Sequence, residues 1–145
     1  MRRAGFVVLA LAILTSGWGA AEAQESGFTV VTHQSNPIDS MSNRDLARLF
    51  LKQKTRWANG GTARPIDQRL AAPVRALFSQ VVLSRDIAEV ESYWNGQVFA
   101  GRSTPPPSAG SDDEVLDFVR RTPGAVGYVS SSSDTGGVKV LSVSE

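Results

Sequence analysis

The sequence contains no cysteine, which excludes disulfide bonds, thiol chemistry and cysteine metal sites. Histidine occurs once, at His33, so the paired histidines of zinc enzymes are excluded as well. No G-x-S-x-G elbow and no P-loop is present, and the serines at 130–133 have no nearby Lys or His to take a proton. The sequence therefore predicts neither an enzyme nor a metal or cofactor site.

The N-terminus has the features of a secretory signal peptide. Arg2 and Arg3 precede an apolar run over 4–14, and Ala21-Glu22-Ala23 forms an A-x-A cleavage pattern. The run is about half the roughly 20 apolar residues of a bilayer-spanning helix, so a retained membrane anchor is the weaker alternative. We expect residues 1–23 to be removed on export and residues 24–145 to form one periplasmic domain.

The chain lacks a basic excess. It has 15 basic and 14 acidic side chains, and loss of Arg2, Arg3 and Glu22 with the signal peptide leaves 13 of each. This balance argues against nucleic acid as a partner. One segment is nevertheless basic, and it either attracts an anion or an acidic partner, or is a solvated face. This basic segment runs from Arg44 to Arg75 and contains two acidic residues, Asp45 and Asp67. Its basic residues are Arg44, Arg48, Lys52, Lys54, Arg56, Arg64, Arg69 and Arg75.

Short strand and helix patterns alternate along the chain. Strands are expected at 28–32, 63–67, 125–129 and 138–143. Three helices are expected to begin at the N-caps Ser42, Ser84 and Ser111, and a further helix has Pro73 in its first turn. In the helix that begins near Pro73, the residues at helical spacing that we expect to be buried are Val74, Leu77, Phe78 and Val81. The pattern predicts an α/β domain with a mixed sheet and helices packed on it.

Three stretches resemble phosphate-type periplasmic substrate-binding proteins of ABC transporters. Residues 42–61 are similar to the family's L-s-x-x-x-L-x-x-I-F-x-G-K-x-x-x-W-x-D-G stretch, 75–94 to the segment that follows it, and 123–129 (P-G-A-V-G-Y-V) to its P-G-A-I-G-Y-V strand. The resemblance runs in order over roughly residues 28–143. Family members have two lobes and more than twice this length, so the resemblance implies a single periplasmic-binding-protein-like lobe.

The resemblance also implies where phosphate binds, and there this sequence differs. Full-length members hold phosphate on this lobe with an Arg and a Ser-Gly-Thr helix start. Alignment on Phe78 puts Ala72-Pro73-Val74 in place of Ser-Gly-Thr, with Gln68 or Arg69 near the Arg. Two hydroxyl donors are then missing, and Pro73 has no backbone N–H to offer an anion.

Four residues are candidates for binding a small anion. His33, Ser35 and Asn36 follow the first strand, where ligands of α/β proteins sit, and Arg69 supplies a cation. The alternative is that these are solvated or capping loop residues.

Two functions are therefore expected. The first is a periplasmic solute-binding protein resembling the phosphate ABC transporter component, which binds phosphate or a related oxyanion and serves a permease. The second is a periplasmic protein-interaction module that kept the lobe fold. A homodimer would rebuild a cleft from two lobes.

Overall fold

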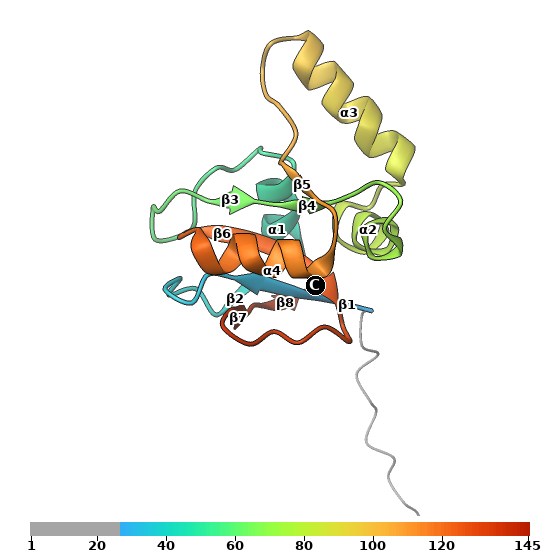
Figure 1. Ribbon diagram of the computed structural model, residues 1–145. Coiled ribbons are helices and arrows are strands. Elements are labelled where there is room, and N and C mark those ends of the chain that lie inside the picture. Colours follow the sequence, from blue (N-terminus) through green and yellow to red (C-terminus); the bar gives the residue numbers. More distant parts are fainter. Residues whose placement is uncertain (1–26) are drawn as a thin grey trace, which may run out of the picture.

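The computed structural model describes residues 27–145, so the expected signal peptide at 1–23 lies outside the described residues (Figure 1). The strands are β1 (Phe28–Thr32), β2 (Ser40–Ser42), β3 (Arg64–Pro65), β4 (Asp67–Gln68), β5 (Ser108–Ala109), β6 (Ala125–Ser130), β7 (Lys139–Val140) and β8 (Ser142–Ser144). The helices are α1 (Asn43–Phe50), α2 (Pro73–Phe78), the π-helix η1 (Ser79–Leu83), α3 (Ile87–Phe99) and α4 (Asp112–Arg121).

A four-stranded sheet in the order β3-β6-β1-β7 forms the centre of the domain. Strand β1 is antiparallel to both β6 and β7, whereas β3 runs parallel to β6. The pairs β2–β8 and β4–β5 are parallel and form two small additional sheets. The predicted α/β architecture with a mixed sheet is confirmed.

Strand β6 separates two hydrophobic layers. Its residues Val126 and Tyr128 face a core formed with β1, α1, α2, η1 and α3. Its residues Ala125 and Val129 face a second core, which α4 covers. Because successive side chains of a strand point to opposite faces, this fully buried strand reads as a continuous apolar run rather than an alternating one. In Figure 1, α4 crosses in front of the sheet and α1 lies behind it.

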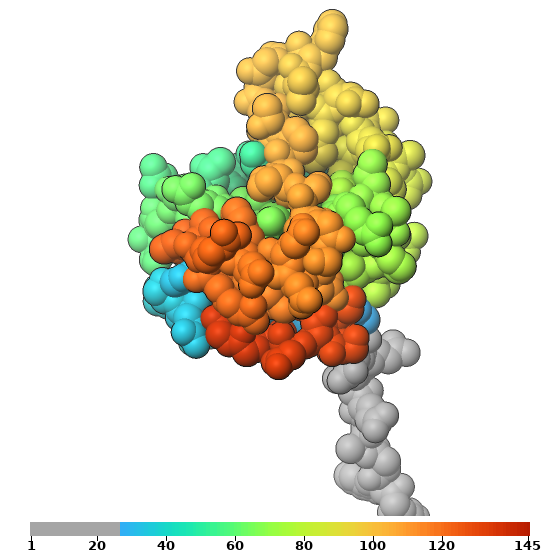
Figure 2. Space-filling model, in the orientation of Figure 1, coloured from blue at the N-terminus to red at the C-terminus, as the bar shows by residue number. Residues whose placement is uncertain are grey.

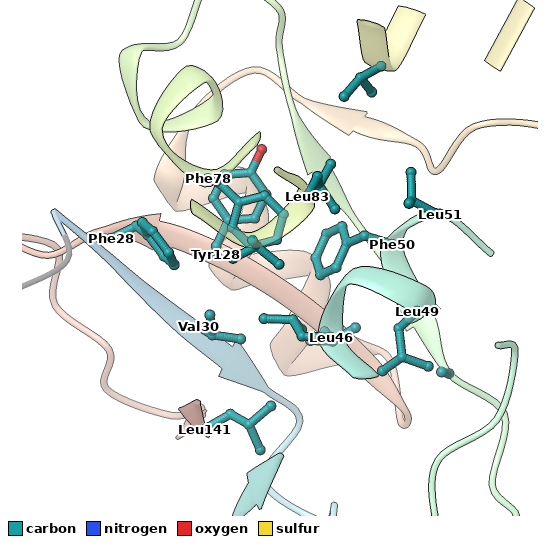
Figure 3. Packing of buried hydrophobic residues seen from close by; sticks show 14 of the residues in the cluster. Phe28, Val30, Leu46, Leu49, Phe50, Leu51, Phe78, Leu83, Tyr128 and Leu141 are labelled. Atoms are coloured by element: carbon teal, nitrogen blue, oxygen red, sulfur yellow. The ribbon is translucent and has the colours of Figure 1, made fainter. Parts of the chain in front are cut away.

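Tyr128 lies at the centre of the larger core (Figure 3). Its ring stacks on that of Phe78, with centroids 3.8 Å apart and planes 3° from parallel. Phe28 meets it edge-on at 6.4 Å, and Phe50 lies tilted at 5.8 Å. Aromatic pairs of this kind stabilise a core by about 0.5–1.5 kcal/mol beyond the area that they bury.

The hydroxyl of Tyr128 joins a buried polar network. It donates a hydrogen bond to Asp67 Oδ1, and Asp67 Oδ2 lies 3.3 Å from Arg75 Nη2. Arg75 Nη1 in turn donates to the backbone oxygen of Gln68 at 2.5 Å. Burial and the neighbouring Asp67 carboxylate raise the pKa of Tyr128 well above its usual value. The hydroxyl therefore stays protonated and acts as a donor.

The predicted helix starts at Ser42 and Ser111 are confirmed. The hydroxyl of Ser42 accepts a hydrogen bond from the N–H of Asp45, and that of Ser111 accepts from the N–H of Glu114. Pro73 is the first residue of α2, as expected. Each of these features depends on residues no more than one helical turn apart, which is why the sequence reveals them.

Two expectations around the π-helix were wrong. Ser84 does not cap α3, because it adopts a left-handed conformation (φ 53°) at the end of η1. Asp86 is the N-cap instead, in a reciprocal capping box with Glu89. Val81 is 45% exposed rather than buried, since the wider turn of η1 shifts the helical register and turns Val82 inward.

Two predicted strands are each divided. The expected final strand consists of β7, which pairs with β1, and β8, which pairs with β2. The two are separated by Leu141, whose side chain is buried in the core and whose N–H donates to the backbone oxygen of Val30 at 2.9 Å. The strand expected at 63–67 is β3 and β4, with Pro65 on the edge of the sheet as predicted.

Two glycines permit close packing around β6. Gly124 has a φ of 81°, and a Cβ there would lie 2.2 Å from the backbone oxygen of Thr62. Gly127 lies beneath α4, where a Cβ would lie 2.7 Å from Val115 Cγ1 and 2.9 Å from Ile66 Cγ2. The glycines of the P-G-A-V-G-Y-V stretch therefore have a steric reason.

We predict that Gly127→Ala lowers the free energy of unfolding by roughly 1–3 kcal/mol, because the added methyl overpacks the α4–β6 contact. Gly96→Ala is the matched control. A Cβ at this α3 position meets no atom within 4 Å, so the change should stabilise the helix by up to about 1 kcal/mol. Urea unfolding monitored by circular dichroism measures both, and equal effects of the two changes would contradict the proposed packing constraint.

We also predict that Tyr128→Phe destabilises the domain by about 1–3 kcal/mol, because the buried Asp67 carboxylate loses a donor. Tyr93→Phe removes a hydroxyl that donates to the backbone oxygen of Leu51 in a part-buried position, and should cost less than about 1 kcal/mol. The same unfolding measurement compares the two variants. A cost for Tyr128→Phe no greater than that for Tyr93→Phe would argue against the network.

Candidate functional site

Three of the four predicted site residues lie together in the loop after β1. His33 Nδ1 lies 2.7 Å from Ser35 Oγ and accepts a hydrogen bond from the Ser35 N–H at 3.1 Å. Asn36 is buried; its Nδ2 donates to Thr32 Oγ1 at 2.9 Å and its Oδ1 accepts from the Ile38 N–H at 3.0 Å. Asn36 therefore holds the loop in shape, and Ser35 is its exposed hydroxyl.

Arg69, the fourth predicted residue, lies toward the other end of the sheet. The N–H of His33 donates to the backbone oxygen of Ala125 at the start of β6. Gln68, next to Arg69, donates from its side chain to the backbone oxygen of Tyr128. Three strand positions separate these two contacts, which is roughly 10 Å along β6. The structure does not bring Arg69 to the other three.

A hollow of about 250 Å³, here named the Arg64 hollow, adjoins the His33 loop. Its lining consists of Ser35, Asn36, Pro37, Trp57, Asn59, Gly61, Thr62, Arg64, Pro123 and Gly124. Arg64 is the charged residue of this lining, and no carboxylate belongs to it. The hollow has room for a small oxyanion, since one water occupies roughly 30 Å³ in the liquid.

Backbone contacts of Gly124 shape the hollow. Its oxygen accepts hydrogen bonds from Trp57 Nε1 and from the Arg64 N–H, both at 2.9 Å. The indole and the start of β3 are thus both held at the carbonyl of Gly124. Sequence reasoning missed Arg64 as a site residue, although it belongs to the basic segment, because only the pairing of β3 with β6 places it beside the His33 loop.

At the opposite end of the sheet, an acidic side chain accepts hydrogen bonds from several donors. Asp112, the first residue of α4, accepts on Oδ1 from Gln68 Nε2 at 2.7 Å. Its Oδ2 accepts from the Ser130 N–H at 3.1 Å and from Ser133 Oγ at 2.7 Å. Burial raises the pKa of the Asp112 carboxyl, but the hydrogen bonds from Ser133, Ser130 and Gln68 outweigh it and keep the pKa below its ordinary value. The group is therefore ionised at neutral pH.

The start of α2, at the position of the family's Ser-Gly-Thr, offers an anion little. Ala72 is the N-cap and forms no side-chain capping hydrogen bond, and Pro73 has no N–H. Arg75, one turn further on, is buried against Asp67. The replacement of Ser-Gly-Thr by Ala72-Pro73-Val74 therefore leaves this helix start without side-chain hydroxyl donors and without an N–H at Pro73, as the sequence indicates.

The basic segment is only partly neutralised. Arg75 pairs with Asp67, and Asp45 lies 3.9 Å from Arg48 and 3.6 Å from Lys54. Within residues 27–145, its other basic residues form no ion pair; these are Arg44, Lys52, Arg56, Arg64 and Arg69. All but Lys52 are exposed, so the segment carries uncompensated surface charge.

The part of the chain that the structure describes, residues 27–145, contains neither a candidate metal cluster nor a candidate membrane-spanning helix. No group of three or more His, Asp or Glu side chains there is placed to hold a metal ion. No helix over residues 27–145 combines the length and the apolar character needed to cross a bilayer.

No family model matches the sequence, and no curated protein matches it either. Solved structures do match. An ABC-type phosphate transport receptor from Vibrio cholerae has a TM-score of 0.64 at 17% identity, covering 81% of this chain and 46% of its own. PstS from Borrelia burgdorferi has a TM-score of 0.64 at 14% identity, covering 82% and 47%. A Clostridium perfringens protein crystallised with bound phosphate has a TM-score of 0.62 at 17% identity, covering 81% and 44%.

The Vibrio cholerae protein is described as a phosphate transport receptor, and the Clostridium perfringens protein as a phosphate ABC transporter substrate-binding protein. The chain spans less than half the length of the solved structures it matches. At these identities the likeness concerns the fold, and its partial coverage corresponds to one of two lobes. The chain has the fold of a single lobe of a phosphate-type periplasmic binding protein.

Proposed function

We propose that this chain is a periplasmic solute-binding protein that holds phosphate or a related small oxyanion in the Arg64 hollow. The observation that carries the proposal is the charge of the hollow, whose charged lining residue is a guanidinium and whose lining includes no carboxylate. Arginine presents several N–H donors in a planar fork that matches an oxyanion. The other end of the sheet, by contrast, already holds the Asp112 carboxylate.

Residues of the hollow and of the His33 loop take defined roles in this proposal. Arg64 supplies charge and donors, and the Thr62 hydroxyl supplies a further donor in the same lining. His33 positions the Ser35 hydroxyl, and Asn36 fixes the loop that carries it. The hollow is open, so we expect modest affinity unless a second lobe covers the ligand.

The likeness of the fold to one lobe of phosphate transport receptors supports the proposal that the chain works in periplasmic solute transport. Residues 1–23 would direct export, and residues 24–145 would form the mature binding domain. A second copy of the chain would supply the missing lobe, and an ABC transporter permease would be the partner that receives the solute. Arg69, exposed at the other end of the sheet, is the alternative cation for the anion site.

We predict that phosphate or sulfate at 100 times its dissociation constant stabilises the mature domain by about 2.7 kcal/mol, which raises its unfolding midpoint by on the order of 10 °C. Arg64→Ala should abolish the rise, because it removes the charge of the hollow. Arg69→Ala is the matched control and should retain it.

Thermal unfolding of residues 24–145 with a panel of oxyanions, at constant ionic strength, makes the measurement. A rise that survives Arg64→Ala and disappears with Arg69→Ala would move the site to the other end of the sheet. The absence of a rise with any oxyanion would reject the solute-binding proposal.

A second candidate function, a periplasmic protein-interaction module, is favoured by the exposed surface. The exposed and unpaired Arg44 and Arg56 lie on it, and Phe99 at the end of α3 is 96% exposed. Figure 2 shows α3 and the connector after it projecting at one edge of the domain. The neighbouring Val98 is also exposed, and contiguous exposed apolar surface, rather than a single exposed side chain, marks an interaction site.

For this candidate we predict that the tagged domain captures a stoichiometric partner from periplasmic extract, and that reversing the exposed Arg44 and Arg56 to Glu abolishes capture. Reversal of Arg102 and Arg121, two exposed cations outside the basic segment, is the matched control and should leave capture intact. Mass spectrometry of the eluate identifies and quantifies the partner. Equal loss in both double variants would indicate a general charge effect and argue against a specific surface.

A further inference from the structure

We infer that Gln68, Ser130 and Ser133 form an oxyanion-binding site, and that the Asp112 carboxylate of the same chain occupies it. In the native protein this carboxylate therefore prevents soluble anions from binding there. This inference concerns the Ser130 end of the sheet and goes beyond the function proposed for the Arg64 hollow.

The donors around Asp112 come from three other parts of the chain. Gln68 Nε2 belongs to β4 and donates to Oδ1 at 2.7 Å. The Ser130 N–H is at the end of β6, and Ser133 Oγ is in the loop that follows; they donate to Oδ2 at 3.1 and 2.7 Å. All three donors are neutral, and within residues 27–145 Asp112 forms no ion pair. Such convergent neutral donors suit an oxyanion.

The donor set is held in place independently of Asp112. Gln68 is 1% exposed, and its Nε2 also donates to the backbone oxygen of Tyr128 at 3.1 Å. The Ser130 N–H is fixed because β6 pairs with β1 at that residue. The buried Gln68 amide cannot move away when its acceptor is lost, so removal of the carboxylate leaves its Nε2 and the Ser130 N–H directed at the vacated, part-buried position. An external oxyanion would replace the carboxylate as their acceptor.

The neighbouring acidic residues do not share this position. Glu114 Oε2 accepts from the Gly110 N–H at 2.6 Å, so this carboxylate serves the start of α4. Asp113 is exposed. Placement of acidic residues at a helix start accounts for these two, since they complement the helix dipole. Only the Asp112 carboxylate, among the three, is directed to donors on the sheet.

Chemical rescue of Asp112→Ala tests the inference. The variant is unfolded thermally with formate, acetate or phosphate against chloride at equal ionic strength, in an Arg64→Ala background that removes the other proposed anion site. At ten times its dissociation constant, formate should raise the midpoint of the variant by about 5 °C. Asp113→Ala, the matched control, and the parent with Asp112 intact should change by less than about 1 °C.

Two further variants sharpen the test. Asp112→Asn keeps the size of the side chain, so its amide fills the site and formate should give no recovery. Ser133→Ala added to Asp112→Ala removes one donor and should weaken formate binding about tenfold, consistent with a hydrogen bond to a charged group.

Three outcomes would overturn the inference. The first is a formate response of Asp112→Ala no greater than that of Asp113→Ala, and the second is an equal response when Asp112 is present. If Asp112→Ala does not fold in chloride, its refolding yield is measured in place of the unfolding midpoint. The third outcome that would overturn the inference is an equal refolding yield with formate and with chloride. Because every measurement is made without Arg64, these outcomes are separate from success or failure of the hollow.

Discussion

The side chain of Tyr128 connects most of the elements on which the domain depends. Its ring joins β6 to α2 through Phe78 and lies against aromatic residues of β1 and α1. Its hydroxyl reaches Asp67 on β4, and Arg75 returns from α2 to the same carboxylate. A buried charge pair costs desolvation energy, which it regains only when its remaining groups are hydrogen-bonded. Within residues 27–145, Arg75 Nε is buried without a hydrogen-bond partner, so the network to which the Tyr128 hydroxyl contributes is incompletely satisfied.

The network also fixes β4 relative to β6, and this determines what each end of the sheet presents. At the Ala125 end, β3 pairs with β6 and places Arg64 beside the His33 loop. At the Ser130 end, β4 carries Gln68 to the start of α4, where it meets Asp112. One end therefore has an uncompensated cation, and the other has an anion already surrounded by donors. The two ends differ in charge although the whole chain is nearly balanced, with 15 basic and 14 acidic side chains.

The fold and the ligand chemistry are separable in this chain. The likeness to phosphate transport receptors concerns the arrangement of the sheet and its helices. It does not fix the groups at the ends of strands, where a single residue changes what is bound. Asp112 illustrates this point, since one carboxylate occupies donors from three segments.

The sequence by itself determined the local features: the caps at Ser42 and Ser111, the start of α2 at Pro73, the buried strand β6 and the α/β class with a mixed sheet. Capping and alternation act between residues a few positions apart, so a pattern in the sequence is enough to reveal them. The tertiary structure alone decided the π-turn that exposes Val81 and the division of the last strand. It also decided that Arg64 joins the His33 loop, that Arg69 lies elsewhere and that Gln68 meets Asp112 across 44 positions of sequence. These contacts form between segments far apart in the chain, and only the packing of β3, β4 and α4 around β6 brings them together.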